Sequence, residues 1–405
     1  MMFKIAPVLT GLSLLSLMLT AFAQPASAKK TEKPIQVASY YFGNYHLNEP
    51  RNEVVHGKGW SEWELVKNAK PRFPGHQQPH VPLWGYEDES DPKVMAKKID
   101  AASKHGIDAF IFDWYDYNGP FLESTINKGF LKAKNRNKIK FALMWANHDW
   151  LDIQPARREN TQKLLYPGKV DQKAFDRICD HVIKDYFLQP NYWKIDGKPY
   201  FSIYDPAKFI ESFGSVEAAK VALDGFRAKA VAAGLPGIHL NVVIWNPFPI
   251  PGETAPTPYT RAAKIAGYDS VSSYVWIHHA GLPEQATDYN YVRDQYLKYY
   301  DRIAKEPDLP YFPNVTMGWD PSPRAAQDQQ FGSFGYPFMN TIKGNTPQRF
   351  KEALQLVKDR LLAQEKGPRI MNINCWNEWT EGSYLEPDTV HKFAYLDAIR
   401  DVFGK

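Results

Sequence analysis

Short apolar runs alternate with helical stretches along most of this chain. The runs are rich in β-branched and aromatic residues, which favours strands. Eight such runs are found, at residues 35–42, 109–113, 140–145, 199–204, 239–245, 270–274, 311–317 and 370–375. Between them, apolar residues mostly recur every three to four positions, which is typical of amphipathic helices. These helices are predicted near 91–105, 121–135, 172–187, 215–233, 260–266, 289–305, 347–365 and 391–402.

Strands that alternate with helices favour a parallel sheet, and eight repeats is the number that closes a (β/α)8 barrel. An open, doubly wound sheet is the competing arrangement. Polar and aromatic residues gather just after the strands, at positions that share one face of a barrel. This pattern favours a single-domain α/β protein, a (β/α)8 TIM barrel with long loops after its strands.

The residues at these strand ends are candidates for ligand contact, because active sites of barrels lie on that face. The candidates are Asp113, Tyr115, Trp145, Asn147, Asp149, Trp150, Tyr204, Trp245, Asn246, Tyr274, Trp319, Asp320, Trp376, Asn377 and Trp379. For Asp113, capping of a helix is an alternative interpretation. Asp320 and Arg324 are close enough in sequence to pair with one another instead.

The first loop, 43–91, is longer than an idle connection and rich in Gly, Pro, Trp and His. This loop contains Trp60, Glu62 and Trp63. These side chains either form part of a lid over the site or pack locally within the loop. His76 and His80 are four residues apart, but Pro79 opposes the helix that would align them as zinc ligands. We therefore expect no metal and no cofactor.

The N-terminal segment 1–28 resembles a secretory signal peptide. Lys4 precedes an apolar run from Ile5 to about Leu19, and the small-residue sites Ala21-Phe22-Ala23 and Ala26-Ser27-Ala28 follow it. The run is too short to span a bilayer comfortably. We expect a catalytic domain at 29–405, exported in soluble form to the periplasm or the extracellular space.

Composition adds few constraints. The chain has 405 residues, of which 44% are hydrophobic and 14% aromatic, as expected for a globular protein with excess aromatic residues. The 49 basic and 45 acidic residues are interspersed, with a net charge of +4, so binding to nucleic acid or an anionic membrane is not indicated. A bridge between Cys179 and Cys375 is not expected, and the oligomeric state stays open.

The stretch 373–382 carries the strongest chemical signal. Glu378 and Glu381 are three residues apart, so one helical turn would place their Cβ atoms roughly 5–6 Å from each other. Such carboxylates do not ionise independently, and the pair then supplies an acid and a base. Glycosidic bond cleavage uses two acids in this way, and aromatic rings stack on the sugar. The alternative is a surface loop with two solvated glutamates.

Several motifs resemble those of the WbsX-like proteins, a branch of the family 99-like glycoside hydrolases. The matching motifs are Gly57-Lys58-Gly59-Trp60-Ser61-Glu62-Trp63, Ala69-Lys70-Pro71-Arg72-Phe73-Pro74-Gly75-His76-Gln77-Gln78-Pro79-His80, Trp145-Ala146-Asn147-His148-Asp149-Trp150, Gly318-Trp319-Asp320 with Arg324, and Trp376-Asn377-Glu378-Trp379-Thr380-Glu381-Gly382 with Glu386-Pro387. They span residues 40–388, most of the chain. The resemblance implies a (β/α)8 barrel.

The resemblance also implies a mechanism. In the endo-α-1,2-mannosidases of family 99, which retain configuration, the first glutamate of the last motif deprotonates the sugar 2-hydroxyl, which attacks its own anomeric carbon. The second acts as general acid and then as general base. Glu378 and Glu381 match these positions, and both are predicted to be catalytic. Thr380 stands where those mannosidases commonly have His, which leaves the sugar specificity open.

The sequence therefore favours an exported glycoside hydrolase that acts on a polysaccharide or oligosaccharide. A non-catalytic glycan-binding barrel would keep the aromatic residues without needing the acid pair. A glycosyltransferase, a label often given to the WbsX-like branch, fits poorly with export because nucleotide-sugar donors are cytoplasmic, and no DxD-type metal site stands out.

Overall fold

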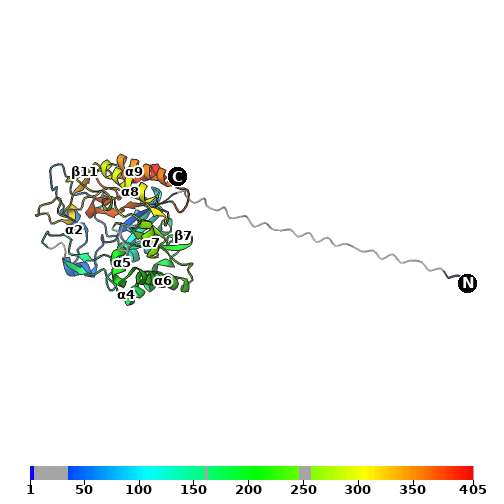
Figure 1. Ribbon diagram of the computed structural model, residues 1–405. Coiled ribbons are helices and arrows are strands. Elements are labelled where there is room, and N and C mark those ends of the chain that lie inside the picture. Colours follow the sequence, from blue (N-terminus) through cyan, green and yellow to red (C-terminus); the bar gives the residue numbers. More distant parts are fainter. Residues whose placement is uncertain (4–34, 160–162, 246–256, 405) are drawn as a thin grey trace. The chain divides into compact units, whose positions relative to one another are not determined.

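Parallel strands closed into a ring form the centre of the structure, a computed structural model that describes residues 1–3, 35–159, 163–245 and 257–404 (Figure 1). From residue 4 onward, the predicted signal peptide lies outside the described residues, so neither its boundary nor export is tested by the structure. Residues 35–404 belong to one compact unit. Within the described residues, no helix combines the length and apolarity needed to cross a membrane.

The barrel strands follow one another in the order in which they occur along the chain. They are β1 (Gln36–Phe42), β2 (Ala109–Asp116), β4 (Lys140–Trp145), β8 (Lys198–Ile203), β9 (His239–Val243), β10 (Ser270–Ser272), β12 (Tyr311–Phe312), β13 (Asn314–Thr316) and β15 (Ile370–Asn374). Apart from β12 and β13, which do not pair with one another, neighbours in this order pair in parallel, and β15 pairs with β1.

Two short strands, β12 and β13, are consecutive parts of one barrel position. Only Pro313 separates them, and proline lacks the N–H that a continuous strand would donate. β12 pairs with β10 on one side, whereas β13 pairs with β15 on the other. The ring of eight positions is thereby closed, and the predicted (β/α)8 barrel is confirmed.

Helices cover the outside of the ring (Figure 1). They are α3 (Pro92–Lys104), α4 (Gln172–Val182) with its continuation η4 (Ile183–Phe187), α5 (Pro206–Phe213), α6 (Val216–Ala232), α7 (Tyr259–Ile265), α8 (Tyr289–Ile303), α9 (Pro347–Leu362) and α10 (Ala394–Phe403). Several begin at a side chain that accepts a backbone N–H, such as Asp91 before α3, Ser215 before α6 and Thr346 before α9.

One predicted helix, 121–135, is wrong in detail. The segment forms the short turns η1 (Thr125–Gly129), η2 (Phe130–Lys132) and η3 (Arg136–Lys138). Gly129 explains part of the difference, because a Cβ at this position would lie 2.1 Å from the main-chain oxygen of Glu89. The chain therefore passes against the first loop at a glycine instead of continuing a regular helix.

The loops contain further short elements. The first loop forms α1 (Pro50–His56) and α2 (Trp63–Asn68). Other loops form β3 (Pro120–Phe121), β5 (Trp150–Leu151), β6 (Leu164–Tyr166), β7 (Lys194–Ile195), β11 (Ala286–Asp288), β14 (Thr341–Lys343), β16 (Asn377–Glu378), β17 (Ser383–Tyr384), η5 (Trp276–His278), η6 (Ser322–Arg324) and η7 (Trp379–Glu381).

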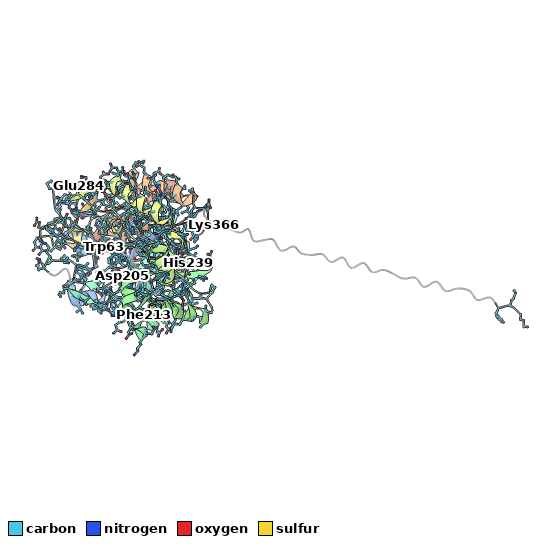
Figure 2. All side chains as sticks on the ribbon, in the orientation of Figure 1. Trp63, Asp205, Phe213, His239, Glu284 and Lys366 are labelled. Atoms are coloured by element: carbon cyan, nitrogen blue, oxygen red, sulfur yellow. The ribbon has the colours of Figure 1, made fainter. Side chains whose placement is uncertain are left out.

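Aromatic side chains make up a large part of the buried core. Figure 2 draws the described side chains on the ribbon. The ring of Trp145, at the end of β4, packs against Phe175 of α4 and Phe209 of α5, with centroid distances of 5.9 and 6.1 Å. Cys179 and Cys375 are both free and buried. The core therefore depends on packing and not on a disulfide.

A buried charge network lies beside the end of β15. Lys98 of α3 contacts Glu89 and Glu386, each at 2.5 Å. The two carboxylates also accept hydrogen bonds from Trp376 and Trp379, both 2.9 Å to Glu386, and from Asn377, 3.0 Å to Glu89. Burial raises the pKa of Glu89 to about 7, although Lys98 lowers it. This network holds the segment that follows β15.

Lys98→Met is expected to lower the free energy of unfolding by about 3–5 kcal/mol, because Glu89 and Glu386 then stay buried without a counter-charge. Urea unfolding followed by circular dichroism measures the loss. Lys93→Met, an exposed position on the same helix, is the matched control.

The double variant Lys98→Met/Glu89→Gln removes one carboxylate together with the lysine, and should recover part of that loss. If Lys98→Met and Lys93→Met are equally stable, the network does not stabilise the segment that follows β15.

Candidate active site

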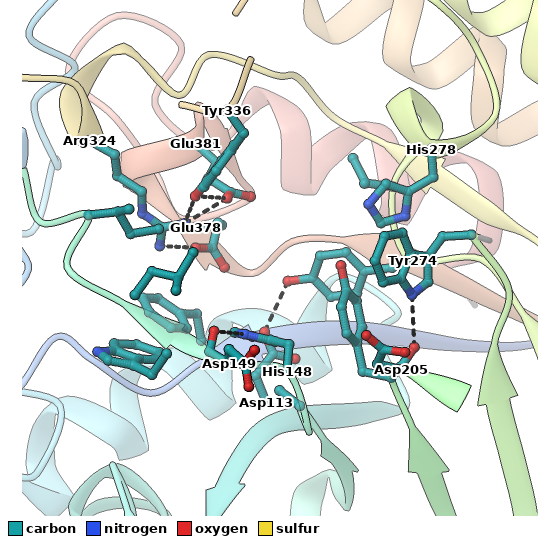
Figure 3. A pocket seen from close by; sticks show the side chains of 18 of the residues that line it. Asp113, His148, Asp149, Asp205, Tyr274, His278, Arg324, Tyr336, Glu378 and Glu381 are labelled. Atoms are coloured by element: carbon teal, nitrogen blue, oxygen red, sulfur yellow. Dashed lines mark hydrogen bonds and ion pairs between the residues drawn. The ribbon is translucent and has the colours of Figure 1, made fainter. Parts of the chain in front are cut away.

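A cavity of about 630 Å³ opens at the carboxyl ends of the barrel strands. Polar and aromatic side chains from many strand ends share its lining (Figure 3). The predicted residues among them are Asp113, Tyr115, Asp149, Trp150, Tyr204, Trp245, Tyr274, Trp319, Glu378 and Glu381. The structure thus brings together residues that are up to 268 positions apart, from 113 to 381.

Arg324 forms the centre of the charged side of this cavity. Its Nη1 and Nη2 donate to Glu381 and Glu378, each at 2.6 Å, and its Nε donates to Glu62 at 3.1 Å. The hydroxyl of Tyr336 accepts from Nη1 at 2.6 Å and donates to Glu381 at 2.8 Å (Figure 3). Arg324 does not pair with Asp320, so that interpretation of the sequence was wrong.

The positions of the two acids follow from a short hairpin after β15. Glu378 lies in β16, which pairs with β17, and Glu381 ends the single turn η7. Gly382 then takes φ +63°, and a Cβ there would lie 2.7 Å from the Cβ of Asp320. The main-chain N–H of Asp320 donates to the main-chain oxygen of Glu381 at 2.6 Å. The predicted turn between the acids is therefore present, and glycine is required after it.

Burial controls the protonation of these acids. Loss of hydration raises the pKa of Glu378 well above its usual value, and the Glu381 carboxylate raises it further, although Arg324 opposes both effects. Burial also raises the pKa of Glu381, while Arg324 and the Tyr336 hydroxyl lower it. The two groups titrate as a pair, so one of them can hold a proton while the other is ionised.

Asp113 faces the acid pair from β2. Its Oδ2 accepts a hydrogen bond from the Tyr274 hydroxyl at 2.9 Å, whereas its buried Oδ1 has no partner among the described residues. Burial raises the pKa of Asp113 well above its usual value, although the hydrogen bond from Tyr274 lowers it. Asp113 lies within a strand and caps no helix, which leaves a ligand contact as the better interpretation.

The opposite side of the cavity contains residues from the loops after β4 and β8. Asp149 accepts from the N–H of Gly168 at 2.8 Å and contacts Lys208 at 3.3 Å. Asp205 caps α5 by accepting from the N–H of Lys208. The ring of Tyr204 lies 5.7 Å from that of Trp245, nearly parallel to it. Charged groups and ring faces are therefore both available to a bound ligand.

Other predicted contacts lie outside the cavity lining and support it. Glu62 is fully buried and, besides Arg324, accepts from Asn44, Gln154 and Thr380 at 2.7, 3.1 and 2.9 Å. Trp63 packs between Tyr45 and Trp379, and Trp60 stacks on His56. The first loop therefore packs behind the acid pair and does not form a lid with these side chains.

The same holds for several residues near the strand ends. Trp145 points outward toward the helices, and Asn147 bonds both main-chain groups of Asp205 at 2.7 and 2.8 Å. Trp376, Asn377 and Trp379 are fully buried and bond to the Lys98 network. These five side chains do not line the cavity, as a substrate contact would require. They support the segments that line it. Asn246 lies outside the described residues.

Asp320 lines a neighbouring cavity instead of the main one. Its carboxylate accepts from His76 at 2.7 Å, from Gln78 at 2.6 Å and from the N–H of Ser322. The ring of His80 contacts that of Tyr384, with centroids 5.6 Å apart and the rings tilted by 58°. Among the described residues, no group of three or more His, Cys, Asp and Glu is arranged to hold a metal ion.

Sequence reasoning missed some lining residues. His148 and Tyr336 line the cavity, as does Arg324, for which only a pairing with Asp320 was considered. His148 belongs to the motif Trp145-Ala146-Asn147-His148-Asp149-Trp150, so its position next to Asp149 is a usable signal. Tyr336 lies in an irregular loop without any periodic pattern, and no sequence signal marks it.

The whole arrangement can perform acid–base chemistry on a polar ligand. Two buried carboxylates share an arginine, and a third, Asp113, has a free oxygen beside them. Ring faces line the rest of the space. Such a site can protonate a leaving oxygen while a neighbouring carboxylate accepts a proton.

Comparison with solved structures supports the fold. The chain is similar to a GH99 endo-alpha-mannosidase from Bacteroides thetaiotaomicron, with a TM-score of 0.54, 15% identity, and coverage of 90% of this chain and 94% of that one. It is also similar to a protein described as "Glycoside hydrolase-like protein", with a TM-score of 0.58, 14% identity, and coverage of 94% and 97%. At these identities the likeness concerns the fold.

Sequence comparison gives the family. The chain is 28% identical over 389 residues to a protein described as "Uncharacterized protein WxcX" from Xanthomonas campestris pv. campestris strain B100, covering 92% of this chain. It spans about half of that relative, 50% of its length. The family described as "Glycosyltransferase WbsX" matches residues 37–399, the larger part of the sequence. The chain therefore belongs to the WbsX family.

Proposed function

We propose that this protein is a glycoside hydrolase that cleaves glycosidic bonds in a polysaccharide or oligosaccharide. The observation that carries the proposal is the buried pair Glu378 and Glu381, held by Arg324 at the mouth of a barrel. The pair has raised pKa values, faces a cavity, and is accompanied by ring faces on which a sugar can stack. The fold shared with glycoside hydrolases supports this interpretation.

The roles of the acids follow the resemblance to family 99. In its ionised form, which the contact with Arg324 favours, Glu378 accepts the proton of the sugar 2-hydroxyl, whose oxygen attacks the anomeric carbon and displaces the leaving group. Glu381 protonates the leaving oxygen and then activates water, so that the configuration at the anomeric carbon is retained. Arg324 contacts both acids, which fixes their orientation while leaving the free oxygen of Asp113 for a sugar hydroxyl.

The family description suggests a glycosyltransferase as the second candidate. A nucleotide-sugar donor carries a diphosphate, which proteins bind with free cationic side chains, a metal ion or a helix N-terminus. The two cationic residues that line the cavity, Lys208 and Arg324, are each already paired with carboxylates. Hydrolysis is therefore the better supported reaction. A non-catalytic glycan-binding barrel would have no use for the acid pair.

The domain boundaries and the location belong to the same proposal. We propose a signal peptide at 1–28 and a catalytic domain at 29–405 that acts on a carbohydrate outside the cytoplasm. N-terminal sequencing of the protein recovered from the periplasm or medium tests both, since cleavage after residue 28 is expected. Recovery of uncleaved protein in the cytoplasm would contradict this location.

Glu378→Gln and Glu381→Gln should each lower kcat on a cleaved glycan by about 10²–10⁴-fold, because each removes one proton-transfer group and keeps the side-chain shape. Turnover is measured on a panel of α-mannans and bacterial exopolysaccharides, with the product anomer read by NMR. Glu217→Gln, an exposed position on α6, is the control. A fully active Glu381→Gln variant would overturn the proposed function.

The two roles can be separated with an activated substrate. A glycosyl fluoride needs little help from an acid, so Glu381→Gln should still carry out the first step on the fluoride, and an added nucleophile such as azide should restore the second step, for which the variant lacks the base. Glu378→Gln should be inactive on both substrate types, with or without azide. A sugar without its 2-hydroxyl should not be turned over by the wild-type protein. The opposite pattern for the two variants would exchange the roles of the acids.

The raised pKa of Glu378 also predicts that Glu378→Gln is more stable than the wild type, by a margin that grows as pH rises. Because this pKa is higher in the folded chain, the unfolded chain loses the proton first, and folding becomes less favourable as pH rises above about 4. Glu378→Gln removes this cost and should stabilise the protein by about 1 kcal/mol at neutral pH.

Thermal unfolding between pH 4 and 8 checks the prediction. The difference in Tm between Glu378→Gln and wild type should grow with pH, while Glu217→Gln should follow the wild type throughout. A variant that is less stable than wild type at pH 7 would show that the contact with Arg324 outweighs the cost of burying the charge.

A further inference from the structure

We propose that the main cavity takes a neutral or amino sugar and excludes sugars that carry a carboxylate, sulfate or phosphate group. The inference rests on the proposed function, because it names the class of substrate for the same site. It is carried by the charges that line the cavity and by the partners that these charges already have.

Carboxylates outnumber cationic groups in the lining. The acidic residues are Asp113, Asp149, Asp205, Glu378 and Glu381, and the basic ones are Lys208 and Arg324. Glu62 adds another carboxylate directly behind Arg324. Even when the acid pair holds one proton and Asp113 another, the remaining acid, Asp149, Asp205 and Glu62 outnumber the two cationic side chains. An anionic ligand would therefore enter against repulsion that is little screened at a buried site.

Both cationic side chains are occupied. All three nitrogens of Arg324 donate to protein acceptors at 2.6–3.1 Å. Lys208 lies 3.3 Å from Asp149 and 3.1 Å from Glu211. A ligand carboxylate that recruited Arg324 would have to leave a buried protein carboxylate without its counter-charge, which is costly. At Lys208, whose partners are partly exposed, a ligand carboxylate would have to compete with two existing ion pairs.

The histidines of the lining do not supply positive charge at neutral pH. Burial lowers the pKa of His278 to about 4, and burial also lowers the pKa of His148, although hydrogen bonding to Asp149 opposes the shift. Neither of the internal segments outside the described residues, 160–162 and 246–256, contains a lysine or an arginine. No cation is therefore left for an acidic sugar among the described lining residues.

Acceptors, in contrast, are available. Asp113 Oδ1 is buried without a partner and needs a donor. Sugar hydroxyls and ammonium groups are donors, whereas a carboxylate or sulfate offers further acceptors only. The lining thus favours a ligand that brings donors to the protein. This is the physical reason for including amino sugars in the accepted class.

The test uses three probes with one ring scaffold: glucose, glucosamine and glucuronate, with mannose and mannosamine as a second pair. Binding to the full-length wild-type protein is measured by saturation-transfer NMR and by quenching of tryptophan fluorescence. The neutral and amino sugars should bind, and glucuronate should bind at least about tenfold more weakly. Equal or tighter binding of glucuronate, or binding of none of these sugars, would overturn the proposal.

Charge variants sharpen the result. Asp113→Asn replaces a group that can become a carboxylate with an amide that donates hydrogen bonds, so it should narrow the discrimination against glucuronate. Asp224→Asn, an exposed position on α6, should leave the discrimination unchanged. If both variants discriminate as the wild type does, the lining charges do not determine selectivity and the proposal fails.

Binding and turnover separate this proposal from the proposed function. Selective binding of neutral or amino sugars by a protein that cleaves no glycan would refute hydrolysis and support the charge selectivity. Rapid cleavage of an acidic polysaccharide with little action on its carboxyl-reduced form would refute the selectivity and support hydrolysis.

Discussion

One guanidinium determines the arrangement of the site. Arg324 contacts Glu62, Glu378 and Glu381, which come from the first loop and from the loop after the eighth barrel strand. Burying three carboxylates without a cation would cost several kcal/mol for each. The loops that carry them are therefore held to Arg324, and a conformation that moves any of them away from it leaves a charge uncompensated.

A second charged layer stands behind the first. Lys98 lies between Glu89 and Glu386, and these carboxylates receive the indole and amide N–H groups of Trp376, Asn377 and Trp379. The residues on either side of Glu378 are thereby held by the Lys98 network, while Arg324 donates a hydrogen bond to the Glu378 carboxylate from the cavity side. Carboxylates that are held from both directions need little reorganisation when a ligand binds.

Much of the fold could be predicted from the sequence, and less of the site. The eight strands and the acid pair followed from local patterns, because strand composition and a spacing of three residues are local properties.

The main error concerned the direction in which some aromatic side chains point. Alternation along a strand places Asp113 and Tyr115 in the cavity but Trp114 outside it, and likewise Met144 inside and Trp145 outside. Attention to that period would have removed Trp145 from the candidates. The contacts of Arg324 had no such signal, since Glu62 is 262 residues away in sequence.

Gly382 has a consequence for how such a site can change during evolution. No side chain fits between it and Asp320, and the backbone of Asp320 bonds that of Glu381. The loops after the seventh and eighth strands are therefore packed and hydrogen-bonded to one another. An insertion in either loop would displace Glu381. New specificities are more accessible through the loops after β4 and β8, whose residues Asp149, Trp150 and Tyr204 reach the cavity without touching this junction. Within this barrel, the geometry of the acid pair and the shape of the rest of the cavity can thus diverge at different rates.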